Sequence, residues 1–181
     1  NPDRAREEYV GLPIPTLEEV LQRYGNAPDI KYYIEIKPNT STGGSVEQTL
    51  LDLIHAYDLY DGAVNDRQVL VQSFIPTSLI NMRALDAELP LIQLYAAGAT
   101  AGVVLASSYA FGIGPSSAEV TPALVSLTHS LGMAIHPYTI NSEDDLAAMA
   151  AMCVDGLFTN FPDRYRDVLS ETDFGCPAPI R

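Results

Sequence analysis

The feature that most restricts the fold of this chain is a regular alternation between two hydrophobic periods. Short apolar runs that suit β-strands are followed by longer segments with the spacing of amphipathic helices, and this happens six times. Repeated strand–helix units predict a parallel sheet with helical crossovers. The six expected strands are 30–37, 69–74, 91–95, 109–113, 133–138 and 154–159.

Helices are expected before the first strand and after most of the others. Three of them begin at a capping-box pattern, in which a hydroxyl residue is followed three positions later by Glu or Gln. These patterns start at Thr16, Ser45 and Ser116. The stretch 96–107 is small and apolar and receives no assignment. The expected helices are 16–24, 45–60, 76–87, 116–131, 142–151 and one that begins at Pro162.

Two folds accommodate this order of elements. A TIM (β/α)8 barrel has eight strands and about 250 residues, so the 181 residues would form a barrel whose first two strands are absent from this chain. The alternative is a complete open, doubly wound sheet. No glycine-rich phosphate loop follows an early strand, which disfavours a nucleotide-binding version. We therefore expect a partial α/β barrel over residues 1–170 and a tail over 171–181.

The net charge of the chain disfavours binding partners that are themselves anionic. The formal net charge is −13, which argues against nucleic acid and against anionic membrane surfaces. No apolar run is long enough for a transmembrane helix, so no stable membrane insertion is expected. An acidic chain is compatible with a bound hard cation.

The two cysteines, Cys153 and Cys176, lack the spacing of a metal site. Cys153 falls in an apolar run and is interpreted as a buried thiol. A disulfide between the two is the less favoured alternative, and it would require an oxidising compartment.

Polar residues collect at the ends of the expected strands, where ligands bind in parallel α/β folds. In the first strand, Glu35 and Lys37 share one face, and Pro38, which has no N–H to donate, ends the strand. His136 lacks a titrating partner and is interpreted as structural. The residues at these ends are Glu35 and Lys37, Gln72 and Ser73, Gln93 and Tyr95, His136 and Tyr138, and Thr159 and Asn160.

Six motifs in a fixed order resemble the glycerophosphodiester phosphodiesterases, in particular their periplasmic or secreted bacterial branch. They run through nearly the whole chain. The motifs are Pro15-Thr16-Leu17-Glu18-Glu19-Val20-Leu21, Tyr33-Ile34-Glu35-Ile36-Lys37, Gln72-Ser73-Phe74, Gly112-Ile113-Gly114-Pro115, His136-Pro137-Tyr138-Thr139 and the segment from Asp155 to Asp163.

This resemblance implies a (β/α)8 barrel that hydrolyses glycerophosphodiesters, as small-molecule substrates, to sn-glycerol 3-phosphate and an alcohol. It also implies a divalent cation, Ca2+ in preference to Mg2+. By residue-wise match, Glu35 would be a metal ligand, Lys37 would contact the phosphate, and Gln72 would bind substrate. Phe74 and Tyr138 would line the glycerol pocket. The catalytic histidines of the family would lie upstream, so no catalytic residue is expected in this chain.

Two other functions remain open from the sequence. A non-catalytic barrel would bind phosphodiester head groups or a protein partner. A related lipase would act on membrane lipid, although the acidic charge disfavours it. A barrel without two strands exposes sheet edges, so the missing N-terminal segment or self-association is expected to cover them. The resemblance places the protein in the periplasm or outside the cell.

Overall fold

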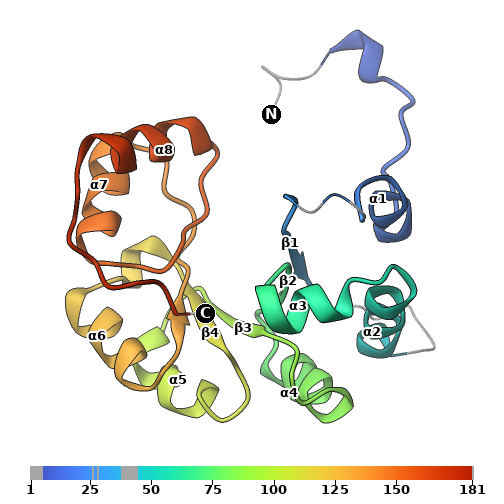
Figure 1. The fold of residues 1–181 in the computed structure, drawn as a ribbon, viewed down its shortest axis with the longest axis horizontal. Helices are drawn as coiled ribbons and strands as arrows, with labels where there is room; N and C mark the ends of the chain where they lie inside the picture. Colours follow the sequence, from blue (N-terminus) through green and yellow to red (C-terminus); the bar gives the residue numbers. More distant parts are fainter. Residues whose placement is uncertain (1–5, 26, 28, 38–44, 181) are drawn as a thin grey trace.

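The computed structural model describes residues 6–25, 27, 29–37 and 45–180. Within these residues, a sheet of parallel strands forms in the order β1-β2-β3-β4-β5 (Figure 1). Neighbours in the sheet are neighbours along the chain, so the order never reverses as it does in a doubly wound sheet. This is the winding of a (β/α)8 barrel. The strands are β1 (Tyr32–Glu35), β2 (Val69–Ser73), β3 (Leu91–Tyr95), β4 (Gly112–Pro115) and β5 (Ala134–Ile135).

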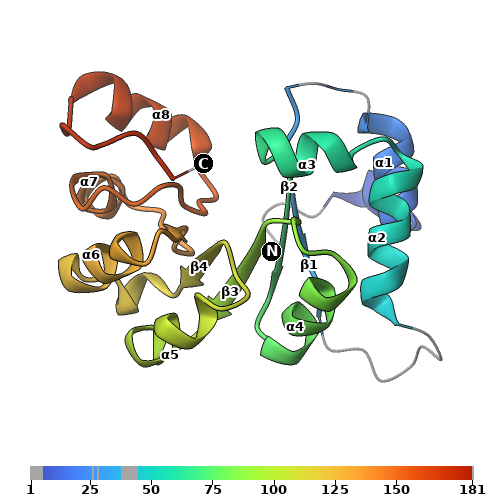
Figure 2. The same ribbon diagram turned by 60° about the horizontal axis from the view of Figure 1, so that its bottom comes forward.

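The helices lie outside the curve of the sheet (Figures 1 and 2). Short 3-10 turns occur at Glu7–Tyr9 and Ser117–Glu119. No helix of the described residues is long and apolar enough to cross a membrane. The α-helices are α1 (Leu17–Tyr24), α2 (Val46–Ala56), α3 (Tyr60–Asp66), α4 (Pro76–Leu85), α5 (Ala99–Ala106), α6 (Pro122–Ser130), α7 (Glu143–Ala151) and α8 (Pro162–Glu171).

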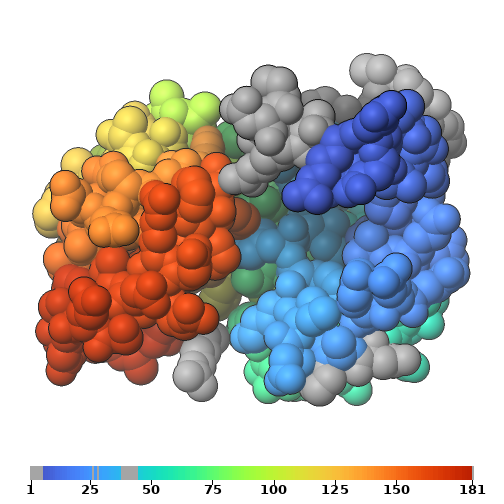
Figure 3. Space-filling model, turned by 90° about the horizontal axis from the view of Figure 1, so that it is seen from above, coloured from blue at the N-terminus to red at the C-terminus, as the bar shows by residue number. Residues whose placement is uncertain are grey.

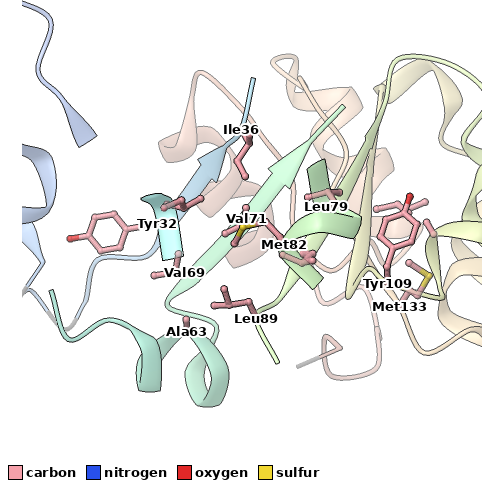
Figure 4. Packing of buried hydrophobic residues seen from close by; sticks show 14 of the residues in the cluster. Tyr32, Ile36, Ala63, Val69, Val71, Leu79, Met82, Leu89, Tyr109 and Met133 are labelled. Carbon is pink, nitrogen blue, oxygen red and sulfur yellow. The ribbon is translucent and has the colours of Figure 1, made fainter. Parts of the chain in front are cut away.

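The hydrophobic core lies between the outer face of the sheet and the helices. Successive strand residues point to opposite faces, so alternate residues of β1 and β2 enter this core. Figure 4 shows Tyr32, Val69 and Val71 on this face of β1 and β2, with Met82 of α4 beside Val71. The other residues of the same strands face a concave inner surface. Figure 3 shows the molecule hollowed between the blue and the orange-red parts of the chain.

The last expected strand, 154–159, is not a strand in the structure. Its backbone instead makes scattered bonds to the segment after β5, including Phe158 N to Pro137 O at 2.9 Å and Ile140 N to Phe158 O at 2.9 Å. Pro137 has no N–H, so it cannot complete a regular ladder. The same proline shortens the expected strand 133–138 to the two residues of β5.

Two helix predictions also need correction. The expected helix 45–60 ends at Ala56, because Asp58 adopts a left-handed conformation with φ 55°. Helix α3, which the sequence did not indicate, begins at Tyr60. The unassigned stretch 96–107 contains α5, which the sequence did not indicate because apolar residues cover the helix all round.

The expected capping box at Ser116 does not form, since Ser116 makes no side-chain cap bond. Its intended partner, Glu119, accepts hydrogen bonds from Gly98 N at 2.8 Å and Ala99 N at 3.3 Å, at the N-terminus of α5. Helix α6 begins later, after Thr121, whose hydroxyl caps it. A carboxylate at a helix N-terminus satisfies otherwise unpaired N–H groups and opposes the helix dipole.

The interpretation of Cys153 as a buried free thiol is wrong, because the structure joins it to Cys176 in a disulfide. The Cα atoms are 5.4 Å apart and the residues are separated by 23 positions. The bond fixes the segment after α8, which contains no helix or strand over 172–180, to the end of α7.

Candidate functional site

The candidate site is a cavity of about 190 Å³ at the carboxyl ends of the strands, on the concave face. The register of the sheet pairs Glu35 of β1 with Gln72 of β2, so both side chains enter the cavity from adjacent strands. Four of the five predicted site residues therefore come together here. The residues that line the cavity are Glu35, Gln72, Phe74, Leu94, Tyr138, Thr139 and Phe158.

Lys37, the fifth predicted site residue, lies at the rim and does not line the cavity. Its Nζ is 3.9 Å from Oε2 of Glu35, and its side chain is 74% exposed, against 26% for Glu35. A pair this long and this exposed holds the ammonium group weakly. The lysine is thus free to turn toward an anion at the mouth of the cavity. Pro38, expected to end this strand, falls outside the described residues.

Two aromatic side chains form one wall of the cavity. The rings of Phe74 and Tyr138 meet edge to face, with centroids 5.8 Å apart. The Tyr138 hydroxyl donates a hydrogen bond to the Tyr95 carbonyl oxygen at 3.0 Å, which fixes the ring. Burial, with a further contribution from the charge of Glu35, raises the pKa of Tyr138, so its hydroxyl stays protonated. Phe74 is 43% exposed and offers an apolar surface to a ligand.

The oxygen atoms in this cavity suit a hard cation, but those of the described residues are too few to complete its coordination. Oε1 of Gln72 is buried and has no hydrogen-bond partner among the described residues, and it comes from the position paired with Glu35. Carboxylate and amide oxygens are preferred ligands of Ca2+, which takes about 6–8 of them. No cluster of three or more His, Cys, Asp or Glu occurs within the part of the chain that the structure describes.

Beneath the cavity, Tyr33 and His136 join opposite sides of the concave face. The Tyr33 hydroxyl and His136 Nδ1 are 2.9 Å apart, and the Tyr33 ring packs edge to face on Phe158 at 4.7 Å. Burial lowers the pKa of His136 to about 4, so the ring is neutral near pH 7 while its Nδ1 is hydrogen-bonded to the Tyr33 hydroxyl. The contact gives His136 a structural partner. It sets the spacing between β1 and the segment that carries Tyr138.

One wall of the cavity depends on a residue without a side chain. A Cβ atom at Gly114 of β4 would lie 2.6 Å from Cδ2 of Leu94, the apolar residue that lines the cavity from β3. The glycine therefore leaves room for the Leu94 side chain beside β4.

Phe158 and Thr139 also line the cavity, although no role was predicted for them from the sequence. Both lie inside motifs that carry the family resemblance. Their place in those motifs was the one feature of the sequence that could have identified them. The backbone around them is irregular, so the alternation of inward and outward side chains cannot be used there.

Three residues expected at the ligand end of the sheet, Ser73, Gln93 and Tyr95, point to the helices instead, and Tyr95 packs against Gly102 of α5. Ser73 donates to the Ile36 carbonyl oxygen at 2.7 Å, and Gln93 accepts from the Tyr109 hydroxyl at 2.8 Å. Both are buried and paired within the fold, so they are not available to a ligand.

Comparison with known proteins identifies relatives over most of the chain. The model of the "Glycerophosphoryl diester phosphodiesterase family" matches residues 1–164. A glycerophosphodiester phosphodiesterase of Bacillus subtilis (strain 168) is 37% identical over 173 residues, covering 92% of this chain and 58% of the relative. One of Bacillus altitudinis is 33% identical over 166 residues, covering 87% of this chain and 63% of the relative. The chain thus spans about three fifths of the length of these relatives.

Solved structures show the same fold. A phosphodiesterase from Oleispira antarctica, in complex with the product sn-glycerol-3-phosphate, superimposes with a TM-score of 0.74 at 19% identity. The match covers 87% of this chain and 62% of that one. A glycerophosphodiester phosphodiesterase from Parabacteroides distasonis ATCC 8503 gives 0.73 at 17% identity, over 87% and 64% of the two chains. The strand order and these likenesses confirm the barrel fold and exclude the doubly wound alternative.

Proposed function

The chain belongs to the glycerophosphoryl diester phosphodiesterase family, and on that premise we propose that its protein hydrolyses glycerophosphodiesters to sn-glycerol 3-phosphate and an alcohol. The names of its relatives support this activity, as does the product bound to the structural neighbour from Oleispira antarctica. The observation that carries the proposal is the convergence of Glu35, Gln72, Phe74 and Tyr138 on one cavity at the ligand end of the sheet.

In this proposal the described residues bind and orient the substrate. Glu35, with the unpaired Oε1 of Gln72 beside it, would hold a divalent cation, proposed to be Ca2+. The cation would neutralise negative charge on the phosphate. Lys37 turns from Glu35 toward the phosphate, which replaces a weak exposed pair with a charge-assisted contact. Phe74 and Tyr138 pack against the carbon atoms of the glycerol.

Proton transfer is not assigned to the cavity. Its lining, among the described residues, contains no histidine, and the Nδ1 of His136 is already engaged by Tyr33 below it. The roles proposed for the described part of the chain are therefore substrate binding and charge neutralisation.

The proposal is tested by the Glu35→Gln substitution in the full-length protein, with glycerophosphocholine as substrate. We expect cation-dependent turnover to fall by about 100-fold or more, because an amide keeps the shape but loses the charge that holds the cation. Glu143→Gln, which removes a carboxylate from the exposed first turn of α7, is the matched control and should leave turnover unchanged. Full activity in Glu35→Gln would refute the site. Restoring chelated enzyme with Ca2+ or Mg2+ separately tests the cation.

A second candidate function is a non-catalytic barrel that binds phosphodiester head groups. The observation that favours it is the lack of a cluster of three metal-ligating side chains among the described residues. Such a protein would bind glycerophosphocholine, measured by calorimetry, without releasing sn-glycerol 3-phosphate. Release of that product by the full-length protein would exclude this candidate.

We also propose that the protein works outside the cytoplasm, in the periplasm or beyond. The Cys153–Cys176 disulfide supports this location, since structural disulfides persist in oxidising compartments. Alkylation of thiols in freshly lysed cells, followed by mass measurement, should find both cysteines unmodified. Alkylation of both would contradict the location.

A further inference from the structure

The segment 172–180, called the strap below, leaves α8 and returns across the molecule without forming a helix or strand. Figure 1 shows it in dark red, running from α8 past α7 to the centre of the molecule beside β4. The match to the family model ends at residue 164, before the strap begins. The strap is therefore an addition to the part of the chain on which the proposed activity rests.

Two attachments hold the strap. One is the disulfide between Cys176 and Cys153, next to the end of α7. The other is a hydrogen bond from Ile180 N to Oδ1 of Asp155 at 2.8 Å. A cavity of about 600 Å³ separates the strap from α8, so close packing there does not hold it.

The carboxylate that receives the strap is part of the barrel framework. Oδ2 of Asp155 accepts from Ile135 N of β5 at 2.9 Å and lies 2.9 Å from Nε2 of His129 in α6. The side chain is only 4% exposed. The strap thus ends on a group that is fixed by the sheet and by a helix, and this fixed point determines where the strap lies.

The strap forms a wall of a second cavity, of about 800 Å³, at the opposite end of the barrel from Glu35. Lys31 and Gln68, which precede β1 and β2, line this cavity and mark it as the amino end of the sheet. Tyr33 and His136 reach it from above, and Pro179 and Ile180 of the strap close it from the side. This cavity is the floor of the barrel.

We infer that the Cys153–Cys176 disulfide is the latch of this strap, which covers the floor of the barrel when oxidised and releases it when reduced. Without the disulfide, the hydrogen bond that still ties the strap to the rest of the described chain is the one from Ile180 N to the Asp155 carboxylate, and it does not offset the entropy lost by ordering nine residues. The inference concerns the strap alone and does not depend on the proposed activity.

The release requires a dithiol reductant. One of its thiolates attacks a sulfur of the disulfide and forms a mixed disulfide with that cysteine, while the other cysteine leaves as a thiolate and takes up a proton. The second thiol of the reductant then displaces the first cysteine. Two electrons and two protons pass to the protein, so Cys153 and Cys176 end as thiols and the reductant as a disulfide.

Hydrogen exchange followed by mass spectrometry tests the latch in the full-length protein, with and without dithiothreitol. We expect reduction to speed the exchange of the Ile180 amide, which is bonded to Asp155, about tenfold or more, while peptides from β2 and β3 stay protected. A Cys153→Ala, Cys176→Ala double variant should exchange as fast as the reduced protein, and dithiothreitol should not change its exchange rate. A strap as protected after reduction as before would overturn the inference. An equal loss of protection in the strap and in the sheet would also overturn it, since the disulfide would then stabilise the whole fold and not the strap alone.

Acylation of histidines by diethyl pyrocarbonate tests whether the strap covers the floor. His136 shares the floor cavity with the strap, whereas His55 is exposed on α2 and serves as the internal reference. We expect reduction to raise the acylation rate of His136 about tenfold relative to His55. An unchanged ratio would show that the strap does not cover the floor.

Discussion

The buried His136 makes the stability of the fold depend on pH in a defined direction. Its Nδ1 is hydrogen-bonded to the Tyr33 hydroxyl, and burial lowers its pKa from the ordinary 6.5 to about 4. In the unfolded chain the ring returns to water and titrates normally. Below pH 6.5 the unfolded state therefore binds a proton that the folded state does not.

The size of this effect follows from the two pKa values. The contribution of His136 is fully present above pH 6.5 and falls by about 1.4 kcal/mol for each pH unit, until the folded protein also titrates near pH 4. From pH 6.5 down to about pH 5, the expected loss is about 2 kcal/mol, and most carboxylates remain ionised over this range.

Urea denaturation at about pH 7 and about pH 5 measures this loss. The His136→Gln variant keeps an acceptor for the Tyr33 hydroxyl but cannot titrate, so it should lose about 2 kcal/mol less than the unsubstituted protein between the two conditions. His55→Gln, at an exposed helix position, is the control and should keep the original pH dependence. If His136→Gln and the unsubstituted protein lose equal stability, the histidine does not titrate on unfolding and the reasoning is refuted.

Three further substitutions test other contacts. Asp155→Ala leaves three donors without an acceptor and should lower the free energy of unfolding in urea by about 3 kcal/mol. The control Asp167→Ala, at an exposed ion pair, should change it by less than about 0.5 kcal/mol. Equal effects of the two substitutions would contradict the framework role of Asp155. Gly112→Ala puts a methyl group 2.6 Å from a backbone oxygen of β5 and should cost about 3 kcal/mol in the same assay; an unchanged midpoint would show that the strands can separate. Phe74→Ala, at a 43% exposed position, should raise KM for glycerophosphocholine about tenfold with little loss of thermal stability; an unchanged KM would remove Phe74 from the glycerol pocket.

The sequence predicted the parallel sheet well because buried strands leave a strong local signal. Runs such as Val69–Ser73 are apolar and short, and the segments between them have helical spacing. The same apolar runs do not indicate which residues face the helices and which face the inside of the barrel. Ser73 and Gln93 could therefore be placed at a strand end but not on the correct face, since alternation is lost when both faces are buried.

The capping patterns show that short sequence motifs do not always predict which helix a side chain will cap. Ser45 accepts from Gln48 N, which is half of the predicted capping box, while the Gln48 side chain donates to Asp52. Ser116 caps nothing, although the two patterns look alike. The Glu119 carboxylate instead accepts hydrogen bonds from the N–H groups of Gly98 and Ala99, which lie 21 and 20 residues earlier in the sequence. The disulfide is a similar case, because its formation depends on the path of the strap and not on the residues near either cysteine.

The missing side chain at Gly114 determines how wide the candidate site is. A methyl group there would meet Leu94, which lines the cavity, and would force this side chain to move. The volume open to a substrate is therefore set by a strand that contributes no atom to the cavity lining. Substituting this one position offers a way to engineer the pocket for smaller ligands while its charged and aromatic groups stay the same.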